Sequence, residues 1–263
     1  MNVSLRIVAT SCIVCMGIAQ SQAASGYDLG DMWWNPAESG WGIDFIQQKD
    51  VVVATLYVQG PDSKPEWYTS ALRFGGLSAQ THEMTCSGDL YEATGTRYGI
   101  TPYALAGVRR VGSITVVAPT MTTATLTYSI DGVEATKSIR RYTFRWDDYD
   151  GTYSGAWSVT ATRCTNPADD GTRTVPTTLT FARSGTAMTV VALDNSRSCS
   201  YSGPYTQEGR LGRIDSTYTC GTGEVGAMAL EEINVQRFGV MGRLFGANNR
   251  GCHLEGTFAG LRD

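Results

Sequence analysis

The sequence predicts an all-β protein made of two antiparallel domains, each a β-barrel or a strongly curved β-sandwich. Three observations carry this prediction. Apolar and polar residues alternate along short segments, turn residues separate these segments at regular spacing, and the composition favours strands. The 263 residues include 32 Thr, 13 Tyr and 30 Gly but only 3 Lys. Thr and Tyr favour strands, and Gly is typical of turns.

In the first half, strands are expected where apolar side chains recur at every second residue, because successive side chains of a strand point to opposite faces. The clearest hairpin has Leu126, Tyr128 and Ile130 alternating with polar residues. Asp131-Gly132 is a favoured two-residue turn after it. The strands expected in this half are 41–47, 51–58, 66–74, 85–93, 124–130 and 133–140.

The pattern breaks around Asp147-Asp148-Tyr149-Asp150-Gly151 and then restarts. We therefore place a boundary there, with an N-terminal domain at 27–146 and a C-terminal domain at 151–263. Asn166–Thr172 is interpreted as a surface loop. The strands expected in this half are 152–162, 177–181, 187–193, 198–205, 210–219, 224–235, 239–245 and 252–259.

Met1–Ala23 has the three parts of a signal peptide. Arg6 supplies the positive charge, Ile7–Ala19 is a short apolar stretch, and Ser21-Gln22-Ala23 places small residues before a cleavage site. We therefore predict an exported protein, periplasmic or extracellular, whose mature chain begins at Ala24.

Export makes disulfides possible, because the compartments outside the cytoplasm are oxidising. Five cysteines follow the predicted cleavage site, and four of them allow three connectivities. We favour Cys199–Cys220, which would join neighbouring strands, and Cys164–Cys252, which would join the first and last strands of the C-terminal domain. Cys86 is left unpaired. It is interpreted as a buried small apolar residue, with a nucleophile or an intermolecular bridge as the alternative.

Several classes of function do not fit. The net charge of −4 argues against a nucleic-acid binder, and no run of roughly 18 apolar residues predicts a membrane span in the mature chain. His82-Glu83-Met84-Thr85-Cys86 begins like a zinc-binding HExxH motif but has Cys in place of the second His. Asp148-Tyr149-Asp150-Gly151 lacks the first and last ligands of a calcium loop. We expect no metal and no cofactor.

Residues 33–42, with the sequence WWNPAESGWG, resemble the opening of an uncharacterised family of exported proteobacterial β-proteins. The resemblance continues through Trp67-Tyr68, 88–95 and the hairpin at 124–141, so it covers about 31–146. Cys86 and the loop around His82 depart from the pattern. The family has no established activity, so the resemblance implies an exported β fold and nothing about chemistry. Residues 150–263 match no family.

The aromatic residues of this motif are candidate binding residues. Trp33 and Trp34 are adjacent, as are Trp67 and Tyr68, so a strand cannot place both members of a pair in one core. The outer ring of each pair, with Trp41, could stack on a sugar or an apolar partner. The alternative is that the second ring covers a barrel end or packs between the domains.

Glu38 lies in a turn between Pro36 and Gly40. As a general acid it would need a partner carboxylate or an apolar pocket that raises its pKa. Accepting backbone hydrogen bonds in the turn is the alternative that we favour.

No catalytic motif emerges, so we lean toward a protein that is not an enzyme. The leading hypothesis is an envelope module that binds a glycan or another envelope protein, through Trp33, Trp34, Glu38, Trp41, Trp67 and Tyr68. A structural or assembly protein of the envelope is the second hypothesis. The third is a hydrolase, which would need two carboxylates about 5–10 Å apart in a cleft. The sequence predicts no oligomeric state.

Overall fold

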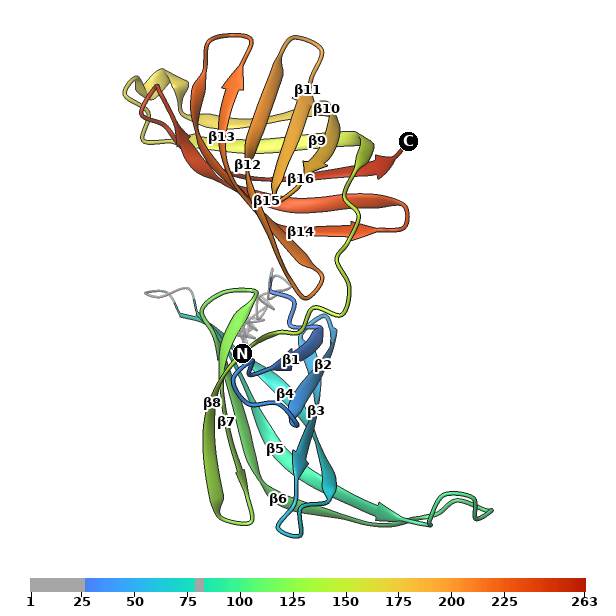
Figure 1. Ribbon diagram of the computed structural model, residues 1–263. Helices are drawn as coiled ribbons and strands as arrows, with labels where there is room; N and C mark the ends of the chain where they lie inside the picture. The colour runs from blue at the N-terminus through green and yellow to red at the C-terminus, as the bar shows by residue number, and fades with distance from the viewer. Residues whose placement is uncertain (1–26, 79–82) are drawn as a thin grey trace, which may run out of the picture.

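A computed structural model describes residues 27–78 and 83–263, which form two closed antiparallel barrels of eight strands each (Figure 1). The predicted all-β class is confirmed, and both domains are barrels rather than sandwiches. The predicted signal peptide, Met1–Ala23, lies outside the described residues.

The first barrel is a meander in which each strand pairs with its sequence neighbours. It closes between the first and last strands, through the pairs Trp33↔Arg141 and Trp34↔Arg140. Its strands are β1 (Asp31–Trp34), β2 (Gly42–Gln48), β3 (Val51–Gln59), β4 (Pro65–Leu77), β5 (Met84–Gly95), β6 (Leu105–Ala118), β7 (Thr123–Ile130) and β8 (Val133–Arg141).

The second barrel has the same up-and-down order, and it closes by a much longer seam between its first and last strands. Its elements are β9 (Gly151–Thr162), the 3₁₀ turn η1 (Pro167–Asp169), β10 (Gly171–Ser184), β11 (Ala187–Leu193), β12 (Ser198–Glu208), β13 (Leu211–Cys220), β14 (Val225–Gln236), β15 (Gly239–Asn248) and β16 (His253–Arg262). Residues 142–150 connect the two barrels.

Each barrel has its own core, formed by the inward-facing half of every strand. In the first barrel the core is mainly aliphatic, with Ile43, Leu56, Leu90 and Leu126 all fully buried. In the second barrel aromatic side chains occupy much of the interior, and the largest of them are Tyr149, Tyr153, Trp157, Phe181, Tyr201, Tyr205, Tyr218 and Phe258.

Two features of the first barrel test the sequence pattern closely. Asp131 and Gly132 both adopt positive φ, 48° and 86°, as a type I′ hairpin turn requires. The pattern did not identify β6. Its residues 105–110 are all exposed and so have no core to alternate against, whereas its residues 111–118 do alternate and could have been predicted as a strand.

Both favoured disulfides are present. Cys164 bonds to Cys252, and Cys199 bonds to Cys220. The second pair joins residues that lie directly opposite each other on β12 and β13. The first ties the end of β9 to the start of β16, at the same end of the barrel.

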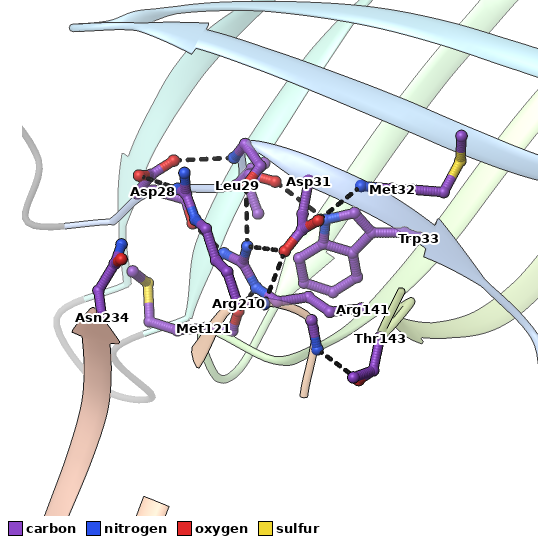
Figure 2. Close-up of polar contacts among 12 residues, drawn as sticks. Asp28, Leu29, Asp31, Met32, Trp33, Met121, Arg141, Thr143, Arg210 and Asn234 are labelled. Atoms are coloured by element: carbon purple, nitrogen blue, oxygen red, sulfur yellow. Dashed lines mark hydrogen bonds and ion pairs between the residues drawn. The ribbon is translucent and has the colours of Figure 1, made fainter. Parts of the chain in front are cut away.

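Arg141, the last residue of β8, is the centre of the junction between the barrels (Figure 2). Its side chain is fully buried. Nε donates to the carbonyl of Met121 at 2.6 Å, Nη1 donates to the carbonyl of Gly30 at 2.9 Å, and Nη2 donates to that of Asp28. Asp31 provides the countercharge at 3.2 Å. The guanidinium therefore joins three separate segments of the N-terminal barrel.

The turn between β12 and β13 connects the second barrel to this centre. The amide of Arg210 donates to Asp31 at 3.2 Å, and the Arg210 guanidinium pairs with Asp28. Gly209 adopts a φ of 60°, and a Cβ there would clash with Asp31 and Arg141. A residue without a side chain is therefore needed at this contact between the two barrels.

Replacing Arg141 tests this junction. Arg141→Met leaves three carbonyls and the Asp31 carboxylate without their buried donor, so we expect a loss of about 3–5 kcal/mol in the free energy of unfolding, measured in urea. Arg140→Met is the matched control. Arg140 is half exposed and pairs with Glu208, so its loss should cost less than about 1 kcal/mol. Equal effects of the two substitutions would contradict the assigned role.

The two disulfides should contribute unequally, because they close loops of different length. Cys164–Cys252 spans 88 residues and Cys199–Cys220 spans 21. Replacing the first pair by serine should lower stability by about 4–5 kcal/mol and the second by about 3 kcal/mol, through the greater freedom of the unfolded chain. Chemical denaturation of the two double variants measures the difference, and the opposite order would refute this account.

Candidate ligand-binding site

The fold separates the aromatic residues that the sequence analysis grouped together. Trp33 and Tyr68 are buried in the first barrel, whereas Trp67 faces outward and is 52% exposed. The predicted split of each adjacent pair between two faces is therefore confirmed. It also means that these residues do not line one cavity.

Trp33 belongs to the core. Its indole Nε1 donates to the carbonyl of Leu29 at 2.9 Å, and its ring contacts Phe45 edge-on. The Arg141 guanidinium lies 5.0 Å from the centre of the ring. Figure 2 shows the indole beside the Arg141 and Asp31 pair. The Trp33 ring is fully buried among residues of the protein itself, so a ligand cannot reach it.

Trp34, on the opposite face, packs against the segment that connects the barrels. Its ring meets Tyr142 edge-on at 4.9 Å, and Tyr142 meets Phe144 in the same way at 4.8 Å. This arrangement corresponds to the alternative in which the second ring packs near the domain boundary. Trp67 instead lies opposite Tyr57 on β3, and both rings are on the outer surface.

Glu38 and Trp41 form a small cluster with a residue of β8. The Glu38 carboxylate accepts from Lys137 Nζ at 2.7 Å and from Trp41 Nε1 at 3.1 Å. The hydrogen bond from Lys137 lowers the pKa of Glu38. A general acid needs its pKa raised, so these contacts argue against a catalytic role. The expected backbone hydrogen bonds in the turn are replaced by these two side-chain donors, one of which comes from β8.

Tyr68 is also engaged inside the protein. Its hydroxyl donates to Glu66 at 2.5 Å, and burial raises its pKa above the ordinary value. Of the six residues proposed as binding residues, only Trp67 therefore presents a largely open side chain.

A cavity of about 330 Å³ lies instead at one end of the second barrel. We call this end of the barrel the mouth. Small-ligand pockets occupy this size range and often lie at the mouths of β-barrels. The apolar residues of the mouth come from the strands and the polar ones from the ends of strands and the loops. Its lining includes Trp157, Val159, Ala161, Tyr201, Tyr218, Met228, Leu254, Asp169, Arg173, Arg197, Glu224, Asn248 and Arg250, with cysteines of both disulfides.

Three of the cavity-lining residues, Trp157, Tyr201 and Tyr218, belong to a continuous stack of four rings that ends at Phe258. Phe258 stacks on Trp157 at 5.4 Å, Trp157 on Tyr201 at 5.2 Å, and Tyr201 on Tyr218 at 5.1 Å. The two outer contacts join residues paired on neighbouring strands. The contact between Trp157 and Tyr201 joins β9 to β12, which are not neighbours, and so crosses the barrel interior. The stack therefore connects β9 with β12 across the interior, and the mouth opens beside it.

The polar groups of the mouth are held in a network. Glu224 accepts from the Tyr218 hydroxyl at 2.9 Å and pairs with Arg197 at 3.5 Å. Arg197 and Arg173 also approach Asp194, at 3.8 and 3.4 Å. Burial raises the pKa values of Tyr201 and Tyr218 above the ordinary value.

The disulfides hold this network in place. Cys199 and Cys220 lie two residues from Tyr201 and Tyr218, so they share the inward face with these rings. The same spacing in the sequence was the available signal for the mouth. It was missed because the C-terminal aromatics were interpreted only as parts of strands.

In comparisons with known proteins, no family model, no curated protein and no solved structure matches this chain. The resemblance of residues 31–146 to the exported β-protein family therefore stays a prediction. Within residues 27–78 and 83–263, no helix is long and apolar enough to cross a membrane.

Cys86 offers a test of the first barrel. Its side chain is fully buried beside Met84, and burial raises the pKa of the thiol to about 11. Only a thiolate reacts readily, so we expect no measurable labelling by iodoacetamide at pH 7.5 in the folded protein and complete labelling in urea. Labelling of the folded protein within minutes would restore the nucleophile interpretation.

Proposed function

We propose that the protein is an exported carbohydrate-binding protein that takes a small sugar, or the end of a glycan chain, in the mouth of the second barrel. The observation that carries this proposal is the combination of a cavity of about 330 Å³ with aromatic lining residues and a fixed ring of charged and hydroxyl groups. Eight-stranded barrels are wide enough to hold one small ligand in this way.

The polar groups suit a ligand with many hydroxyls. Arg197 and Glu224 have planar groups that can engage two neighbouring hydroxyls at once. Tyr218 already donates to Glu224, which orients the carboxylate. A sugar also has an apolar face of C–H groups. The ring partners cover the faces of Trp157 and Tyr201, so the matching apolar surface below the rim comes from Val159 and Ala161 and from the edges of the two rings.

The rigidity of the site supports binding over assembly or catalysis. The disulfides and the ring stack leave the mouth walls with little freedom, so a ligand would not have to order them. The disulfides are also typical of a protein outside the cytoplasm. They support the predicted export to the periplasm or the extracellular space.

A glycan array followed by calorimetry tests the proposal. The full chain should bind at least one class of glycan. Arg197→Met should weaken that binding at least tenfold, because it removes the rim cation that contacts Glu224 and Asp194.

Arg213→Met is the matched control. Arg213 also has two acidic partners, Asp215 and Glu231, but it does not line the mouth. The glycan affinity of the Arg213→Met variant should equal that of the wild type. Failure to bind any glycan on the array, or equal weakening by both substitutions, would refute the proposal.

A further inference from the structure

The β5–β6 hairpin extends well beyond the end of the first barrel (Figure 1). Within it, Ala93 pairs with Val108 and Thr94 with Gly107, outside any barrel wall, and residues 101–110 are all exposed. Two-stranded ribbons with no core beneath them are marginally stable in water. The projecting hairpin is therefore suited to a partner outside residues 27–78 and 83–263.

The end of this hairpin, residues 96–105, has an unusual composition for an exposed segment. We call it the tip. It contains no acidic residue, and its one charged side chain, Arg97, has no ion pair among the described residues. Its large apolar side chains are between 50% and 92% exposed, and they are Tyr98, Ile100, Tyr103 and Leu105.

The charges on the stem of the hairpin are neutralised locally. Arg109 pairs with Glu92 at 2.8 Å and with Asp131 at 2.5 Å, and Arg110 pairs with Asp89 at 2.8 Å. The apolar tip and its single free cation are therefore separated from the barrel by a polar stem.

Three backbone amides of the tip form hydrogen bonds within the tip itself. The amide of Thr96 donates to the carbonyl of Ala104 at 2.9 Å, and the amide of Ala104 donates to the Thr96 hydroxyl at 3.0 Å. The amide of Ile100 donates to the carbonyl of Arg97 at 3.2 Å. Backbone groups that leave water must be paired, so these three bonds lower the cost of placing the turn at a membrane surface.

We propose that the tip docks into the surface of a phospholipid membrane. Tyr98 and Tyr103 would lie at the level of the headgroups, as aromatic residues with a polar end prefer, and Ile100 and Leu105 would reach the acyl chains. The protein has a net charge of −4, so the unpaired Arg97 makes the tip the favourable point of approach to anionic lipids.

The size of the tip favours a membrane over another protein. Stable protein interfaces use about 20–30 residues a side, whereas the tip consists of residues 96–105 on a narrow projection. A membrane needs only a few inserted side chains. This proposal is independent of the sugar site, which lies at the mouth of the other barrel.

Vesicle flotation with the full chain tests the proposal. The protein should float with vesicles of phosphatidylglycerol and phosphatidylcholine, and more weakly with pure phosphatidylcholine. Tyr98→Ser combined with Ile100→Ser should reduce the bound fraction at least tenfold. Arg97→Ala should weaken binding to the anionic vesicles only. These residues lie outside the barrel core, so the variants should keep the wild-type unfolding curve.

Ile46→Ser combined with Phe238→Ser is the matched control, because both residues are similarly exposed but lie away from the tip. This variant should float like the wild type. The proposal would be overturned if the wild-type protein floated with neither kind of vesicle, or if the tip variant bound vesicles as well as the wild type does. It would also be overturned by sedimentation showing that the tip variant converts a dimer into a monomer, because the tip would then be a contact between copies.

Discussion

The buried guanidinium of Arg141 is the interaction on which the arrangement of this molecule depends. A charge withdrawn from water is tolerated only when every donor finds an acceptor. Its acceptors are the carbonyls of Asp28, Gly30 and Met121, so the entry to β1, the end of β8 and the turn after β6 must adopt one mutual arrangement. Asp31 then extends that order to the second barrel through the amide of Arg210.

The two barrels share one topology but use their interiors differently. The first is packed mainly with aliphatic side chains, and its outward extension is the projecting β5–β6 hairpin. In the second, a stack of rings connects β9 with β12 across the interior, and the mouth opens beside it. The two disulfides lie at that open end, where closure by packing alone would be weakest. The polar residues of the candidate site therefore gather where the core stops.

Much of the fold could be predicted because it depends on local patterns. Strand alternation predicted that Trp33 and Trp34 lie on opposite faces, the Asp131-Gly132 dipeptide defined its turn, and the Cys199–Cys220 disulfide joined two strands that are neighbours in the chain. The outer half of β6 could not be found in this way, because a ribbon with no core needs no alternation of apolar and polar residues. The candidate site was missed for a different reason. The WWNPAESGWG motif drew attention to the first barrel, whereas the cavity lies in the second.

The sequence by itself determined the all-β class, the alternation of faces along the strands and the break near residue 147, because each depends on side chains that alternate with a period of two. It favoured the disulfide pairing that is present, but Cys164–Cys252 joins the first and last strands and so depends on closure of the barrel. Only the tertiary structure decided that the sheets close into barrels and that Trp157 meets Tyr201 across the interior. The physical reason is that curvature and closure determine which inward side chains meet. They depend on all eight strands together, and no local segment of the chain encodes them.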